Sequence, residues 1–157
     1  MATRTIQRVT RYGTGSNVMK YGEASGQSFK QGELVYLVSG LVTVVAADGQ
    51  SILGIAQNDA SGTAATACYV DVLKSTDWIL INAYHATAAS AVMTDANVGT
   101  VAAGVDTSSN KTVADINAGS NKTFKIIARI PEDSATDIYP RCIACILDTY
   151  AQSNHTA

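Results

Sequence analysis

The sequence carries little charge. Charged residues make up 15% of its 157 residues, against about 25% in an ordinary soluble domain. Alanine, glycine, serine and threonine fill the difference and together occupy 66 positions. A surface of small residues loses little side-chain entropy when another protein covers it, because long charged side chains lose the most. The composition therefore favours a component of an assembly over a freely diffusing enzyme.

Residues that carry chemistry are also scarce. The two histidines, His85 and His155, have no Gly-x-Ser-x-Gly motif to supply the serine of a hydrolase triad. Three cysteines are an odd number, which argues against a secreted disulfide framework. Cys142 and Cys145 form a Cys-x-x-Cys motif, but in a strand they point to opposite faces, and a zinc site needs four ligands. We interpret them, with Cys68, as packing residues, and we predict no catalytic activity, cofactor or metal.

Neither a membrane span nor a secretory signal is visible. No apolar run approaches the roughly 20 residues of a transmembrane helix, and Met1–Arg11 is polar, without the apolar centre of a signal peptide. We expect a soluble protein made in a cytoplasm, with no membrane partner. The formal net charge is −2 and the basic residues are sparse, which argues against direct binding to nucleic acid.

Charge is unevenly distributed along the chain. Residues 1–30 carry a net charge of +4 and residues 31–157 a net charge of −6. Residues 1–28 show no persistent hydrophobic period, so we predict an extended basic N-terminal arm that becomes ordered on contact with an acidic surface, such as a neighbouring copy. The residues of this arm expected to make contacts are Arg4, Arg8, Arg11 and Tyr12. The alternative is a solvated tail whose arginines only aid solubility.

The rest of the chain has the pattern of a β-rich body. Phe29–Ala60 contains three short apolar segments separated by Ser39-Gly40 and Asp48-Gly49, which are typical of tight antiparallel turns. Further apolar segments, several of them alternating, follow at spacings of roughly 8–12 residues, as in all-β barrels and sandwiches. The expected strands are Leu34–Val38, Leu41–Ala46, Ile52–Ala56, Cys68–Leu73, Trp78–Tyr84, Val98–Ala103, Lys111–Ile116, Phe124–Ile130 and Cys142–Asp148.

We therefore predict an all-β fold, a small β-barrel, β-tulip or sandwich of about eight short strands with an extended N-terminal arm. The arm comprises residues 1–28, the barrel body residues 29–150, and a flexible C-terminal tail residues 151–157.

Several aromatic residues lie on strand faces or in loops where a monomer does not require them. Trp78–Tyr84 has apolar residues on both faces, which indicates a central strand or an interface strand. Aromatic and arginine side chains together are typical of the core of a protein–protein interface. The candidate contact residues of the body are Trp78, Tyr84 and Arg129, accompanied by Tyr69, Ile127, Tyr139 and Arg141. The alternative is that a small barrel buries these side chains.

The segment from Gln31 to Ala56 resembles a known family. It reads Gln-Gly-Glu-Leu-Val-Tyr, then Ser-Gly-Leu-Val, then Asp-Gly-Gln-Ser-Ile-Leu-Gly-Ile-Ala. This succession resembles the small capsid decoration proteins of tailed bacteriophages, also called cement or head-stabilising proteins. Cys68–Val72 and Asn97–Gly99 fit later positions of the family pattern, and Glu33 stands where the family more often has aspartate.

The resemblance implies a function as well as a fold. It implies a β-barrel or β-tulip body, usually a homotrimer, that sits on the exterior of the expanded capsid and binds the major capsid protein. It also implies a virion location, synthesis in the host cytoplasm, and an N-terminal arm that augments a capsid strand or clamps adjacent subunits. The alternative is a glycan- or receptor-binding β-domain displayed on a particle surface, which the low charge and the aromatic residues permit.

Overall fold

The computed structural model describes residues 4–13, 15–47, 49–87, 90–107, 111–117, 120–133 and 136–154. The chain is all-β, as the sequence predicts, with short 3-10 turns at Asp95–Asn97, Asp148–Tyr150 and Gln152–Asn154. The strands are β1 (Thr10–Tyr12), β2 (Val18–Glu23), β3 (Leu34–Val38), β4 (Leu41–Val44), β5 (Gly54–Ala56), β6 (Ala67–Val72), β7 (Trp78–Tyr84), β8 (Val101–Thr107), β9 (Lys111–Asp115), β10 (Lys122–Arg129) and β11 (Arg141–Ile146).

The first half of the chain forms a closed five-stranded barrel in the order β2-β4-β3-β5-β6. Its β3–β4 hairpin turns at Ser39 and Gly40, which both have positive φ (50° and 81°), as a two-residue hairpin turn of the primed type requires. The barrel closes because β2 pairs with β4 in parallel and with β6 in antiparallel orientation. At Gly54 the strands β5 and β6 approach so closely that an added Cβ would collide with the Asp71 carbonyl oxygen.

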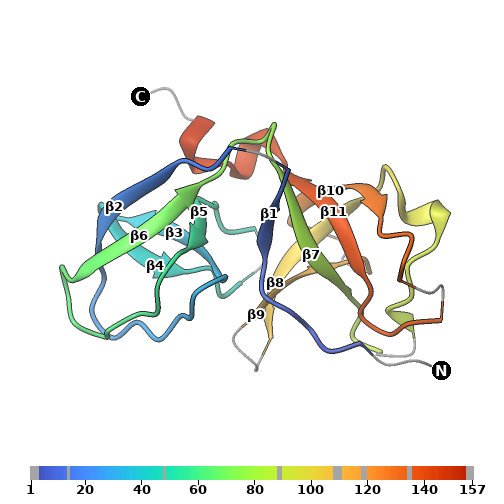
Figure 1. Ribbon diagram of the computed structural model, residues 1–157, viewed down its shortest axis with the longest axis horizontal. Coiled ribbons are helices and arrows are strands. Elements are labelled where there is room, and N and C mark those ends of the chain that lie inside the picture. Colours follow the sequence, from blue (N-terminus) through green and yellow to red (C-terminus); the bar gives the residue numbers. More distant parts are fainter. Residues whose placement is uncertain are drawn as a thin grey trace.

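The second half forms another ring of strands. The pairings run from β7 to β11, β10, β8 and β9, and β9 pairs back with β7. The edge of β7 opposite β11 is shared, because Thr10–Tyr12 of β1 pairs with its first part and Ala114–Asp115 of β9 with its end. Figure 1 shows the two barrels side by side, with β1 between them.

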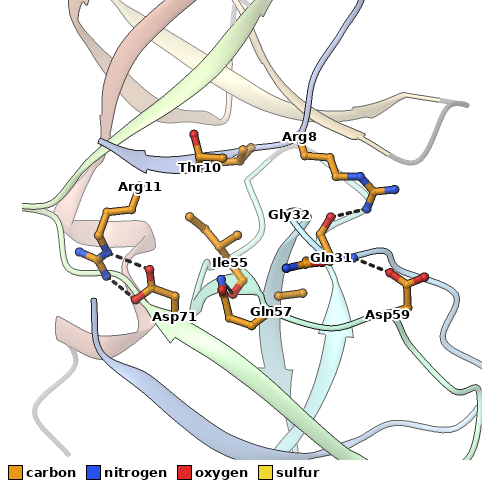
Figure 2. A pocket seen from close by; sticks show the side chains of 11 residues that line it. Arg8, Thr10, Arg11, Gln31, Gly32, Ile55, Gln57, Asp59 and Asp71 are labelled. Carbon is orange, nitrogen blue, oxygen red and sulfur yellow. Dashed lines mark hydrogen bonds and ion pairs between the residues drawn. The ribbon is translucent and has the colours of Figure 1, made fainter. Parts of the chain in front are cut away.

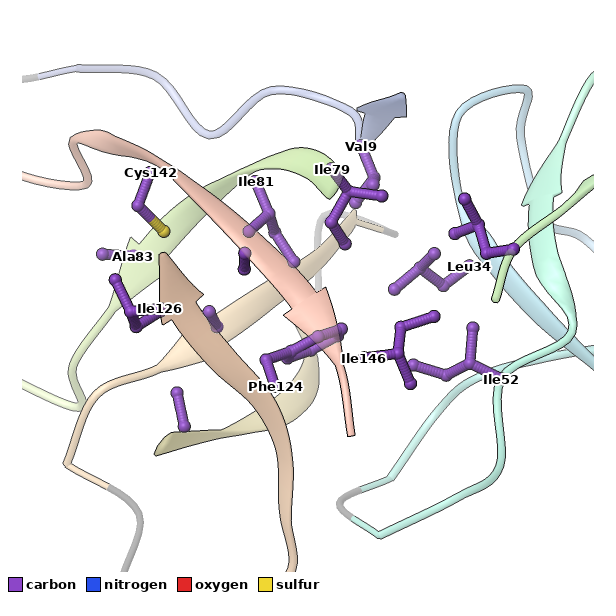
Figure 3. Packing of buried hydrophobic residues seen from close by; sticks show 14 of the residues in the cluster. Val9, Leu34, Ile52, Ile79, Ile81, Ala83, Phe124, Ile126, Cys142 and Ile146 are labelled. Carbon is purple, nitrogen blue, oxygen red and sulfur yellow. The ribbon is translucent and has the colours of Figure 1, made fainter. Parts of the chain in front are cut away.

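Two clusters of buried apolar residues form the hydrophobic core of the molecule. Phe29, Val35, Val42 and Val70 belong to a cluster that fills the first barrel. The larger cluster includes Phe124, Ile126 and other residues of the second barrel, and part of it is drawn in Figure 3. It also includes Leu34, Ile52, Ile55 and Leu73 from the first half of the chain, together with Val9 from the segment before β1. The larger cluster therefore contains residues of both barrels and forms an apolar core that they share. Val9 is part of this shared core.

The N-terminal segment differs from the extended arm that the sequence predicts. Val18–Glu23 is a strand of the first barrel, and Thr10–Tyr12 is a strand of the second sheet. Both find backbone hydrogen-bond partners within the chain, so this part needs no second protein to become ordered. The body that was expected as one barrel, residues 29–150, contains strands of two barrels, and the first barrel needs residues from before position 29.

The C-terminal segment also differs from the prediction of a flexible tail. Ala151 is fully buried and bridges to Ile52. The Gln152 side chain accepts the Leu37 N–H at 2.7 Å and donates to the Leu37 carbonyl oxygen at 2.9 Å. Up to residue 154 the tail thus packs on the first barrel, while residues 155–157, including His155, lie outside the described residues.

Candidate functional site

Arg11 is fixed to the first barrel by charge. Its guanidinium donates to both carboxylate oxygens of Asp71 at 2.8 and 2.9 Å, to the Val72 carbonyl oxygen at 2.7 Å, and lies 3.1 Å from Asp77. The side chains of Arg11 and Asp71 are 11% and 6% exposed. The hydrogen bond to Asp71 is the main cause that raises the pKa of Arg11 above its ordinary value. Arg11 therefore joins the strand β1 to the barrel that β6 belongs to.

Arg4 is fixed to the second barrel in a similar way. It lies 2.6 Å from the buried Asp133 and 3.3 Å from Asp137, and Arg141 also binds Asp133, at 2.8 Å. Burial acts to raise the pKa of Asp133, but hydrogen bonds from Arg141 and the charges of Arg141 and Arg4 outweigh it, so this pKa lies below the ordinary value. Between these anchors, the Asn82 side chain accepts the Gln7 N–H at 2.7 Å.

Two of the three N-terminal arginines, Arg4 and Arg11, are therefore partners of the chain's own carboxylates. The sequence predicts that Arg4, Arg8 and Arg11 meet an acidic surface, and for Arg4 and Arg11 that surface belongs to the same molecule. Only Arg8 keeps an exposed side chain, which donates to the Gln31 carbonyl oxygen. Asp71 lies about 60 positions after Arg11, and Asp137 about 130 positions after Arg4. No local sequence pattern connects residues at such separations.

Tyr12 and Trp78 form an exposed aromatic pair. They lie directly opposite each other in the β1–β7 ladder, and directly opposed residues of an antiparallel pair project on the same face. Tyr12 is 46% exposed and Trp78 47%. Across the neighbouring strands, Cys145 of β11 lies opposite Trp78, and Lys125 of β10 lies opposite Cys145. Two of the residues predicted as contacts thus lie together on the outer face of the second barrel, and we call them the aromatic pair.

The other predicted contact residues lie apart from the aromatic pair. Tyr84 is at the far end of β7 and stacks on Tyr139, with ring centroids 5.9 Å apart and planes at 7°. Arg129 ends β10 and pairs with Asp95 at 2.8 Å, where the Asp95 side chain is 87% exposed. An ion pair so open to water contributes little to stability.

The first barrel also carries exposed apolar residues, of which the sequence predicts only Tyr69 as a contact residue. Val18 and Met19 of β2 and Tyr69 of β6 are each close to half exposed. They lie in one antiparallel ladder of the first barrel, in which Lys20 faces Tyr69. Alternation alone could not reveal Val18 and Met19, because consecutive apolar residues at a strand start also occur in buried strands.

A pocket of about 590 Å³ lies between the N-terminal segment and the first barrel. Residues 8–11 form one wall, Gln57 lies on the opposite side, and Ile55 and Ala56 lie between them. The lining is completed by Gln31, Gly32, Asp59 and Asp71. Figure 2 shows Ile55 between the two sides, with the Arg11–Asp71 pair at one end and Arg8 at the other. This volume is in the range of ordinary ligand pockets.

Cys68 and Cys142 each belong to one of the two buried apolar clusters. Burial raises the pKa of Cys142 to about 12 and that of Cys68 to about 11, so both thiols stay protonated at neutral pH. Cys142 is fully buried and Cys145 partly exposed, and both are free thiols. Among the described residues, no group of three or more His, Cys, Asp or Glu side chains is placed to hold a metal ion. Within the same residues, no helix is long and apolar enough to cross a membrane.

Comparison with known proteins does not identify the chain. No protein-family model, no curated protein and no solved structure matches it.

Proposed function

We propose that this chain is a structural virion protein that binds the exterior of an expanded phage capsid and stabilises it by bridging capsid subunits. The observation that carries the proposal is the sequence of Gln31–Ala56, which resembles the capsid decoration family. The strands β3, β4 and β5 of the first barrel arise from this segment. In this proposal the partner is the major capsid protein, the location is the outside of the virion, and the chain acts as a homotrimer without catalysis.

The physical mechanism is mass action on an assembled lattice. A protein that binds the assembled capsid but not the separated subunits shifts the equilibrium towards assembly, and the stabilisation grows with its concentration relative to Kd. A rigid protein suits this task, because it loses little conformational entropy on binding. The shared apolar core and the ion pairs of Arg4 and Arg11 support such rigidity.

The contacts that we assign to the capsid follow from exposure. Tyr12 and Trp78 are large, rigid and half exposed, which is the side-chain type that dominates binding energy in interfaces. Arg4 and Arg11 are assigned to the interior of the molecule, since their guanidinium groups already have carboxylate partners. Of the four residues of the predicted arm that were expected to make contacts, we therefore propose that Tyr12 acts in docking.

The test is to add the purified chain to expanded, undecorated heads of the phage that encodes it. We expect the chain to sediment with the heads and to raise the temperature at which they release DNA. A chain that stays in the supernatant, or that binds without changing heat resistance, would contradict the proposal. Bovine serum albumin at the same concentration serves as the control for nonspecific protection.

A second candidate function is binding of glycans, which the aromatic pair favours. Two neighbouring exposed rings offer a flat apolar platform with polar edges, a surface type suited to partners that are partly apolar and partly wet. A glycan array separates the two functions. Saturable glycan binding that is lost in Trp78→Ser, with no binding to heads, would favour this second function.

A further inference from the structure

The lining of the pocket between the N-terminal segment and the first barrel includes neither residue of the aromatic pair. We propose that this pocket, which we call the β1 groove, binds an extended, uncharged peptide segment. The segment adds as a strand to the free edge of β1 and places an apolar side chain against Ile55. The proposal does not depend on the capsid function, because it concerns the chemistry of the groove alone.

The edge of β1 provides the backbone groups for such a peptide. One edge of Thr10–Tyr12 pairs with β7. Val9 donates its N–H to the Gly32 carbonyl oxygen of the first barrel at 2.9 Å. Backbone groups of alternate residues in a strand point to the same edge, so the N–H and C=O of Arg11 also point away from β7, towards the groove. Within the part of the chain that the structure describes, no backbone hydrogen bond joins Arg11 to the first barrel.

The charges of the groove favour a neutral ligand. Its lining contains two arginines and two aspartates, Arg8, Arg11, Asp59 and Asp71, whose formal charges cancel. Arg11 is already bound to Asp71, and Asp59 is bound by Lys30 at 3.1 Å. A phosphate or a nucleic-acid backbone would meet as many carboxylates as guanidinium groups, and it could bind Arg11 only by displacing the ion pair of Arg11 with Asp71. An uncharged peptide main chain can bind without displacing that ion pair.

The remaining lining matches a peptide main chain with an apolar side chain. Thr10 and Gln57 lie on opposite sides of the groove. The side-chain amide of Gln57 donates to the Ile55 carbonyl oxygen at 3.2 Å and has a further N–H and an oxygen that can exchange hydrogen bonds with peptide groups. Between them, Ile55 and Ala56 form an apolar floor. Strand addition draws affinity from main-chain hydrogen bonds and specificity from pockets for alternate side chains. The β1 groove offers main-chain groups at Arg11 and an apolar surface at Ile55 and Ala56.

The experiment uses the full chain and an array of synthetic octapeptides that are acetylated and amidated at their ends. We expect uncharged sequences with alternating apolar residues to bind. Gln57→Trp and Thr10→Trp fill the groove from opposite sides and should each weaken the best peptide at least tenfold. Val38→Trp adds the same side chain at an exposed position outside the groove, and its Kd should stay within twofold of the wild type. Using two filling variants keeps the test valid if one of them does not fold.

An N-methyl scan of the best peptide tests strand addition itself. Because only every second amide of an added strand faces β1, methylation should weaken binding at alternate positions. Absence of any bound peptide, binding that survives both filling variants, or a scan without alternation would overturn the proposal. Selection of charged peptides, or of a glycan whose binding Gln57→Trp abolishes, would overturn it too.

Discussion

The ion pair between Arg11 and Asp71 gives the sharpest stability prediction. Replacing Arg11 by alanine leaves Asp71, whose side chain is 6% exposed, with the Asn17 N–H at 2.9 Å as the remaining partner of its carboxylate among the described residues. Breaking a buried ion pair by removing one partner costs about 3–5 kcal/mol. Because the Arg11 side chain is 11% exposed, we expect the lower end, about 3 kcal/mol.

Urea unfolding followed by circular dichroism measures this loss. With a slope of about 1–3 kcal/mol per molar urea, Arg11→Ala should lower the midpoint by about 1–3 M at unchanged slope. In thermal unfolding the same loss corresponds to a decrease in Tm of about 6–12 °C. The matched control is Arg129→Ala, which breaks the exposed pair with Asp95 and should cost less than about 1 kcal/mol.

A double-mutant cycle separates the pair from other effects. Replacing Arg11 by methionine and Asp71 by asparagine removes both charges, so the double variant should be more stable than the sum of the single losses predicts, by about 1–3 kcal/mol. Additive losses, or an Arg11→Ala variant as stable as Arg129→Ala, would refute the assignment of Arg11 as the anchor of β1.

Three further predictions concern the fold and the assembly. Gly54→Ala places a Cβ against the Asp71 carbonyl oxygen and should cost about 1–3 kcal/mol, measured by urea unfolding; an unchanged midpoint would contradict the close approach of β5 and β6. The pKa of Asp133 is lowered in the folded chain, so its stabilisation is present above the ordinary aspartate pKa and is lost as the pH falls below about 4. The stability difference between the wild type and Asp133→Asn should therefore shrink between pH 5 and pH 2, and a constant difference would disprove the linkage. Light scattering of the free chain should give a trimer mass, and a monomer mass at all concentrations would remove the trimer from the proposed function.

The sequence predicts the strands better than their arrangement. Leu34–Val38 and Trp78–Tyr84 are strands with the predicted bounds, because their apolar residues and flanking turn residues define them locally. Val18–Glu23 was not predicted, because its apolar residues do not alternate and its exposed start is set by pairing with β6, about 50 residues away. A strand has the same local sequence pattern whether its neighbours belong to its own barrel or to another one. The sequence therefore could not show that residues 29–150 contain strands of two barrels.

The contact residues show the same limit. Exposure of Trp78 agrees with the sequence prediction, since the strand has apolar residues on both faces. The roles of Arg4 and Arg11 could not be predicted, because Asp133 and Asp71 are remote in sequence and a basic N-terminus next to an acidic body is equally compatible with contacts within one chain or between two. The β1 groove is formed by segments that only the fold brings together, so no motif marks it.

Binding of the aromatic-pair variants to heads tests the proposed function most directly. Tyr12→Ser and Trp78→Ser alter half-exposed side chains, so both should fold, and their circular dichroism spectra check this. In co-sedimentation with expanded, undecorated heads, we expect saturable binding of the wild type and at least tenfold weaker binding of Trp78→Ser. Val98→Ser changes a side chain of similar exposure elsewhere and should bind like the wild type. Failure of the wild-type chain to sediment with expanded heads would contradict the account.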